Sequence, residues 1–197
     1  KKSNLYSELL QYYQKCEEKK PFDFNNHTPQ ERLIYSFTIG EVCIKSGDKD
    51  NADKWNSIIH DNFSKGATTY ELKMRYYEFK ANLGVLTNKF KEASQYFFNI
   101  YAENKDKQEA NEYYRKSAVY AILSDDVDKN IQISNLLVED KMRSLPIFKL
   151  LERMIKDNFI SANEIPEFKK HLCNEIGYSD EYLNLIVLHQ NIKIISS

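Results

Sequence analysis

Few residues in this sequence have the types and spacing that chemistry requires. Asp126, Asp128 and Asn130 match the first three ligand positions of a calcium-binding loop. The sixth position is Ile131 instead of glycine, and the twelfth is Leu137 instead of the glutamate that binds calcium with both oxygens. We therefore interpret this acidic run as a helix cap and not as a calcium site.

A second candidate is His171 with Cys173, two residues apart. No second pair of ligands follows at the spacing of a zinc site. The sequence also lacks a glycine-rich phosphate loop, an HExxH motif and any pairing of a nucleophile with a base. We expect no enzyme activity, no cofactor and no metal.

The densest group of basic residues offers a different kind of site. We interpret it as a solvated face, with a protein-docking patch as the alternative. The group consists of Lys73, Arg75, Lys80, Lys89 and Lys91. A net charge of −1 gives no electrostatic case for nucleic acid or for an anionic membrane. The 14 tyrosines and 11 phenylalanines lie mostly at helical core spacing and are not interleaved with arginine, so a stacking platform for single strands is disfavoured.

A pair of helices over residues 68–101, joined at residues 87–89, organises the rest of the chain. Thr68 and Glu71 have the spacing of a capping box, which predicts where the first helix begins. Its apolar residues recur every three or four positions, as on one face of an α-helix. They are Leu72, Tyr76, Phe79, Leu83 and Leu86. The second helix has the same spacing at Phe90, Ala93, Phe97 and Ile100.

This helix pair repeats. A shift of 41 residues back places Ala81 on Gly40, and a shift of 37 forward places it on Ala118. Periods near 40 with a small residue in mid-helix are typical of tetratricopeptide-like (TPR-like) repeats. We therefore predict an all-α fold, a right-handed α-solenoid of about nine to ten helices. The predicted organisation is an N-terminal helix and link over 1–27, TPR-like repeats over 28–137, and a helical continuation over 138–197.

Local signals support these helices at several points. Thr28, Pro29 and Glu31 form a strong start signal, and residues 46–48 (Ser-Gly-Asp) end that helix. Further helices are expected over 3–19, from Ala52 to near Gly66, and over 108–123, 127–137, 145–155, 166–172 and 182–195. Three distant cysteines are simplest to explain in a reduced, intracellular protein.

The second half of the chain carries a more specific resemblance. Residues 118–124 (AVYAILS), 136–141 (LLVEDK) and 147–172 (IFKLLERMIKDNFISANEIPEFKKHL) resemble the PCI family, the scaffold subunits of the COP-nine signalosome and of the proteasome lid. Residues 187–192 (VLHQNI) are similar to the helix that precedes the winged helix of that family. The usual His-Asn pair reads Gln190-Asn191 here, with the histidine at His189. The winged helix itself would begin where the chain stops, at Ser197.

The resemblance implies a non-catalytic scaffold of the signalosome, located in cytoplasm and nucleus. Such a subunit helps to position neddylated cullin-RING ligases while a separate metalloprotease subunit removes the modifier Nedd8. The implied partners are other PCI subunits and the cullin-RING ligase. The implied contact residues near the chain end are His189, Gln190, Asn191 and Ile192.

Three other functions stay open. The chain could be a scaffold of the proteasome lid, or a stand-alone TPR-like module that binds peptides in a concave groove lined with Asn, Lys or Arg. An RNA-binding PCI protein is the third, and an isoelectric point of about 6.5 disfavours it.

Overall fold

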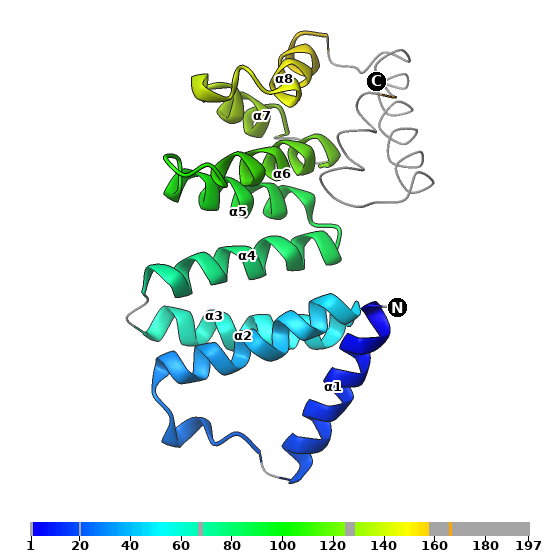
Figure 1. The fold of residues 1–197 in the computed structure, drawn as a ribbon, viewed down its shortest axis with the longest axis vertical. Coiled ribbons are helices and arrows are strands. Elements are labelled where there is room, and N and C mark those ends of the chain that lie inside the picture. The colour runs from blue at the N-terminus through cyan, green and yellow to red at the C-terminus, as the bar shows by residue number, and fades with distance from the viewer. Residues whose placement is uncertain (1, 20, 67–68, 125–128, 158–165, 167–197) are drawn as a thin grey trace. The chain divides into compact units, whose positions relative to one another are not determined.

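The computed structural model describes residues 2–19, 21–66, 69–124, 129–157 and 166, and this part of the chain is helical with no strand (Figure 1). The α-helices are α1 (Lys2–Lys19), α2 (Pro29–Ser46), α3 (Lys49–Lys65), α4 (Tyr70–Leu86), α5 (Phe90–Glu103), α6 (Ala110–Leu123), α7 (Lys129–Leu137) and α8 (Pro146–Asp157). Two short 3-10 helices, η1 (Phe24–Asn26) and η2 (Asp140–Met142), lie between them. The predicted all-α class is confirmed for these residues, whereas the right-handed solenoid stays a prediction. The helices expected over 166–172 and 182–195 lie outside the described residues, apart from Pro166.

The chain forms two compact units, residues 1–89 and residues 90–197. The division falls in the turn between α4 and α5, inside the helix pair that the sequence pattern joined. In the first unit α4 packs on α2 and α3. In the second unit α5 packs most extensively on α6. The apolar spacing of α4 and α5 was thus sufficient to predict two helices but not the partner on which each of them packs.

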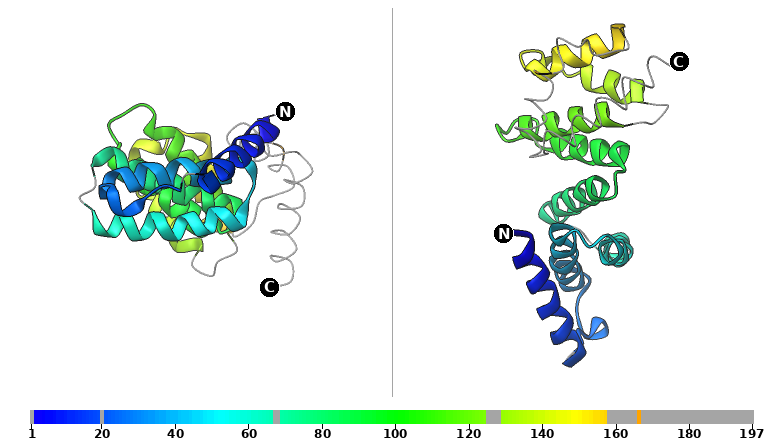
Figure 2. Two further views of the ribbon diagram at one scale, coloured as in Figure 1. Left: turned by 90° about the horizontal axis from the view of Figure 1, so that it is seen from below. Right: turned by 90° about the vertical axis from the view of Figure 1, so that its right-hand side faces the viewer.

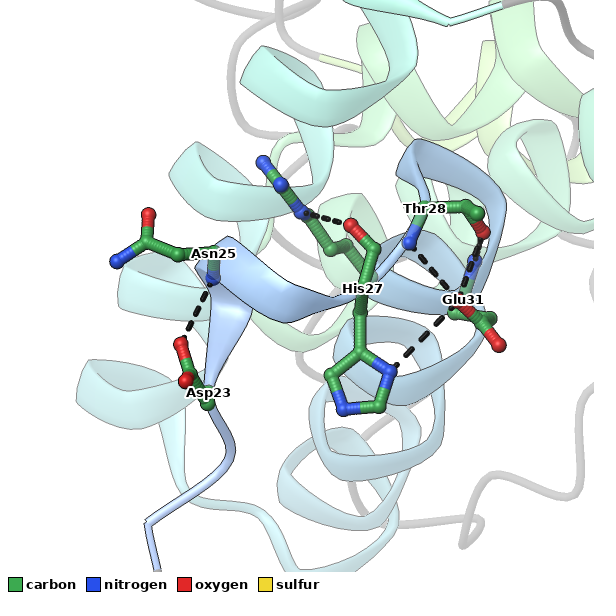
Figure 3. Close-up of polar contacts among 6 residues, drawn as sticks. Asp23, Asn25, His27, Thr28 and Glu31 are labelled. Atoms are coloured by element: carbon green, nitrogen blue, oxygen red, sulfur yellow. Dashed lines mark hydrogen bonds and ion pairs between the residues drawn. The ribbon is translucent and has the colours of Figure 1, made fainter.

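The N-terminus of α2 has the reciprocal capping predicted for it (Figure 3). The backbone N–H of Glu31 donates to the Thr28 hydroxyl at 3.3 Å, and the Thr28 N–H donates to the Glu31 carboxylate at 2.8 Å. Both bonds satisfy donors that the first turn of a helix leaves without a partner. Hydrogen bonds from the backbone and side chain of Thr28 lower the pKa of Glu31.

The start of α4 differs from the prediction by one residue. Thr69, and not Thr68, is its N-cap, with the Leu72 N–H donating to the Thr69 hydroxyl at 3.3 Å. Glu71 is consequently the second residue of the helix and not the third, which is the position that a capping box requires. Its carboxyl pKa is lowered by a hydrogen bond to its own backbone N–H and by the Thr69 side chain. The repeat period predicts the observed N-cap, because a shift of 41 residues places Thr28 on Thr69.

The C-termini of α2 and α4 are also equivalent. At the end of α2, Gly47 has a φ of 82°, and the Asp48 N–H donates to the Cys43 carbonyl at 2.9 Å. At the end of α4, Asn88 has a φ of 60°, and the Lys89 N–H donates to the Gly84 carbonyl at 2.7 Å. Both ends are Schellman motifs, in which glycine or asparagine supplies the left-handed residue. Gly47 and Asn88 are again 41 residues apart, so α2 and α4 begin and end at equivalent positions.

The core of the first unit surrounds α2, which packs on α1, α3 and α4. A Cβ atom at Gly40 would lie 2.7 Å from the Phe79 ring and 3.3 Å from Ile59, so helix α4 makes close contact at this point. The predicted small position is therefore confirmed as a contact for Gly40. Its repeat equivalents Ala81 and Ala118 are fully buried in their respective units.

A 3-10 helix and an aromatic stack lie in the segment that we predicted only as a link after the N-terminal helix. The ring of Phe22 stacks between Tyr35, with centroids 3.9 Å apart, and His27, with centroids 4.3 Å apart. Asp23 caps η1 by accepting from the Asn25 N–H at 3.0 Å (Figure 3). This packing attaches the link to the first turns of α2.

The second unit is built on the α5–α6 pair, with α7 and α8 packed on α6. Ser94 and Ser117 are buried between α5 and α6, and each hydroxyl donates to the backbone carbonyl of the other residue at 2.9 Å. Tyr101 and Tyr114 are also fully buried, with their rings in edge-to-face contact. The hydroxyls of Ser94 and Ser117 are thus satisfied inside this core and not by water at its surface.

Candidate protein-docking surface

A cavity of about 470 Å³ lies between α2 and α4 in the first unit. We name it the α2–α4 groove. Its lining residues are Glu41, Ile44, Lys45, Arg75, Glu78, Phe79 and Asn82. Two acidic and two basic side chains therefore share the groove with one amide and two apolar residues. This mixture suits a peptide or protein segment that carries both charges and an apolar side chain.

Arg75 is the residue that joins α4 to α2 at the groove. Its guanidinium binds the Glu41 carboxylate with two parallel hydrogen bonds, Nε to Oε1 at 2.6 Å and Nη2 to Oε2 at 3.0 Å. Nη2 also lies 3.4 Å from the Thr38 hydroxyl, and the guanidinium carbon lies 5.2 Å from the centre of the Phe37 ring. Both charged side chains are 32% exposed, so the pair remains accessible to water and to a partner.

The other predicted basic residues of α4 also contact their own unit. The Lys80 ammonium donates to the Asn56 side chain of α3 at 3.1 Å. The Lys73 ammonium lies 5.7 Å from the centre of the Tyr77 ring. These lysines are half-buried and are not a solvated face. Of the five predicted residues, only Arg75 lines the groove.

Lys89 and Lys91 belong to different compact units. Lys89 is exposed and ends the first unit, where its N–H takes part in the cap of α4. Lys91 lies in α5, and its backbone carbonyl accepts from the Gln132 side chain at 3.1 Å. Two groups of predicted site residues lie outside the described part of the chain. They are His189, Gln190, Asn191 and Ile192, and His171 with Cys173. Asp126 and Asp128 also lie outside the described residues, whereas Asn130 is an exposed residue of α7.

Sequence reasoning missed most residues of the groove. Glu41 and Asn82 are separated by one repeat period of 41 residues, and both line the groove. A comparison of polar residues one repeat period apart in the sequence could have identified Glu41 and Asn82. Lys45 was missed as well, and its ammonium lies 5.5 Å from the centre of the Tyr6 ring of α1.

The thiol of Cys43, which precedes the groove residue Ile44 in the sequence, is not an activated nucleophile. Cys43 of α2 is fully buried, and desolvation raises its pKa to about 11 with a smaller contribution from Asp48. Such a thiol is protonated at neutral pH and is a poor nucleophile.

Within the described residues, no three His, Cys, Asp or Glu side chains are grouped so that they could hold a metal ion. No helix in this part of the chain has both the length and the apolar character needed to cross a membrane.

Comparisons with known proteins give no match, either to a protein-family model or to a curated protein.

Proposed function

We propose that this chain is a non-catalytic scaffold built from helical repeats, whose function is to hold a protein partner. The observation that carries this proposal is the equivalence of α2 and α4, which share N-caps at Thr28 and Thr69 and C-terminal turns at Gly47 and Asn88. Repeated helices of nearly equal length present similar surfaces side by side, and repeat proteins use such surfaces to bind other proteins.

We further propose that the partner is a neddylated cullin-RING ligase, with the chain acting as a PCI-type subunit of the COP-nine signalosome. The support is the resemblance of residues 118–124, 136–141 and 147–172 to that family. In this assignment a separate metalloprotease subunit removes Nedd8, and this chain positions the substrate in the cytoplasm and nucleus. The other PCI subunits contact the chain through sequence that follows the repeats.

A capture experiment tests this assignment. The immobilised 197-residue chain is incubated with a neddylated cullin-RING ligase and, separately, with purified subunits of the proteasome lid. We expect the ligase to be retained and the lid subunits to be washed away. Retention of the lid subunits alone would favour the lid scaffold, and retention of neither would contradict both assignments.

A second candidate function is a stand-alone peptide-binding module, and the α2–α4 groove favours it. Lys45, Arg75 and Asn82 are the residue types that such a groove requires, and all three line it. Titration of labelled peptides that carry both charges would reveal saturable binding that is lost in Lys45→Glu. The control is Lys54→Glu on α3, since Lys54 is exposed and does not line the groove. Equal binding by both variants would exclude the groove as the peptide site.

A further inference from the structure

One face of α1 is apolar and exposed. Leu5 is 62% exposed, Leu9 37% and Tyr12 64%, and the exposed Cys16 continues the same line. These residues are spaced four, three and four apart, which places them on a single stripe of the helix. We name this stripe the α1 outer face. Its spacing is that of positions a and d in a coiled coil.

Another face of α1 packs on α2. Leu10 is buried, and the half-buried Tyr6 carries the ammonium of Lys45 from α2 over its ring. Figure 2 shows α1 at the edge of the first unit with α2 beside it. The α1 outer face is therefore distinct from the face that holds α1 in the fold.

The charged residues beside the α1 outer face are complementary to the same residues of a second, antiparallel copy. Glu8 and Lys15 are both exposed and precede Leu9 and Cys16 by one residue, which is position g of a coiled coil. They are seven residues apart, two helical turns, on the same edge of the stripe. When two such helices lie antiparallel, the g edges of the two helices meet. Glu8 of each copy then lies beside Lys15 of the other.

We propose that the α1 outer face binds a second copy of this chain, with the two α1 helices antiparallel. A two-fold axis near the middle of α1 pairs Leu9 with Tyr12 of the second copy, and Leu5 with Cys16 of the second copy. The same register forms two Glu8–Lys15 ion pairs, one at each end of the apolar layers. A two-fold axis generates every contact twice, so one patch is sufficient for a closed dimer.

A parallel arrangement lacks this complementarity. In parallel coiled coils position g of one helix faces position e of the other. The e positions here are Tyr6 and Tyr13, so neither Glu8 nor Lys15 would meet an opposite charge. Cys16 would lie beside Cys16 of the second copy. The two orientations therefore differ in which residue approaches the Cys16 thiol.

The expected dimer is weak. An 18-residue helix is about 27 Å long, and one pair of such helices buries less surface than the ~800 Å² per partner of a standard stable interface. Dimerisation consequently depends on protein concentration. The mass of the 197-residue chain, measured by sedimentation from micromolar to millimolar concentration, is expected to rise from monomer to dimer. A monomer over the whole range, or an assembly larger than a dimer, would overturn the proposal.

Substitutions on the α1 outer face then separate this contact from others. Tyr12→Glu is expected to abolish dimerisation with little change in Tm, because Tyr12 is 64% exposed in the monomer. The matched control is Ile131→Glu on α7, which is 61% exposed and belongs to the second unit. Glu8→Lys and Lys15→Glu should each weaken the dimer, and the double variant that exchanges both charges should restore it. A dimer that survives Tyr12→Glu would refute the α1 outer face.

A disulfide tests the antiparallel register directly. In a Cys173→Ser background, Leu5→Cys places a thiol beside Cys16 of the second copy, at the distance of an a–d pair, and Cys43 is buried. Mild oxidation is expected to give a covalent dimer that dithiothreitol reverses. The same background with Leu5 intact should stay unlinked. A linked dimer in that control would show Cys16 beside Cys16, which is the parallel arrangement, and would contradict the proposal.

Discussion

The α2–α4 contact in the first unit and the α5–α6 contact in the second bring two helices together by different means. At α2–α4 the ring of Phe79 packs on a glycine, and the polar bond between Arg75 and Glu41 lies at the rim, where water reaches it. At α5–α6 the polar bonds between Ser94 and Ser117 lie inside the core, out of contact with water. A hydrogen bond is costly to break where no water can replace it. Shape therefore determines the first contact, and buried hydrogen bonding contributes directly to the second.

The largest effect is expected from filling the space at Gly40. A Cβ in ideal geometry at Gly40→Val lies 2.7 Å from a ring atom of Phe79, so the buried ring must move. Overpacking of this kind lowers the free energy of unfolding by about 1–3 kcal/mol. Urea denaturation would measure the loss. Ala81→Leu is expected to act in the same direction, and unchanged stability in both variants would show that close approach does not determine this contact.

Removing one serine of the buried pair should have the next largest effect. Ser117→Ala leaves the Ser94 carbonyl without the hydroxyl that donates to it, which costs about 1 kcal/mol of unfolding free energy. The control is Ser57→Ala on α3, because that exposed hydroxyl donates at 3.3 Å within its own helix. A double-mutant cycle with Ser94→Ala gives the coupling between the two residues. A loss no greater than that of the control would argue against buried hydrogen bonding as a determinant of α5–α6.

A partly buried carboxylate provides an intermediate case in the second unit. Glu139 accepts from the Tyr101 hydroxyl at 2.8 Å and from the Lys105 ammonium at 2.5 Å. Burial alone would raise the pKa of Glu139, but the hydrogen bonds from Lys105 and Tyr101 outweigh it and lower the pKa. The folded-state pKa is therefore below the unfolded one. The stabilisation is complete above the unfolded carboxyl pKa and is lost as pH falls through the folded pKa.

Glu139→Gln is accordingly expected to destabilise the chain at neutral pH and not in acid. The loss at pH 7 should be about 1 kcal/mol, since neutral hydrogen bonds replace charge-assisted ones. Stability measured from pH 7 down to pH 2 should show the wild type and the variant converging below the ordinary carboxyl range. A constant difference over that range would mean that packing of the side chain, and not its charge, stabilises η2 and its neighbours.

The smallest effect is expected at the rim of the α2–α4 groove. Arg75→Gln removes the ion pair with Glu41, and partly exposed pairs contribute at most about 1 kcal/mol. Thermal unfolding in low and high salt would test it, and the small difference should shrink further in high salt. A loss as large as that of Gly40→Val would reverse the comparison, with charge rather than shape determining α2–α4.

Local patterns in the sequence were sufficient to predict the helices but not their partners. Apolar spacing and the Thr28 cap located α2 closely, because capping and amphipathic periodicity depend on neighbouring residues. The cap of α4 was displaced by one residue, since Thr68 and Thr69 compete and only the repeat period separates them. The bond between Arg75 and Glu41 spans 34 residues, and no local pattern contains it. Docking surfaces depend on such distant contacts, which explains why Lys80 was predicted as a surface residue and lies against Asn56.

The matched ends of α2 and α4 also determine which rearrangements of the gene such a chain tolerates. Each helix is started and stopped by its own residues, Thr28 and Gly47 in one case and Thr69 and Asn88 in the other. A duplication or deletion of one whole 41-residue period, with its joins at the capping threonines, leaves every helix with both of its end signals. The boundaries at Thr28 and Thr69 are therefore the natural points for recombination, whether by evolution or by a designer who wishes to lengthen the chain.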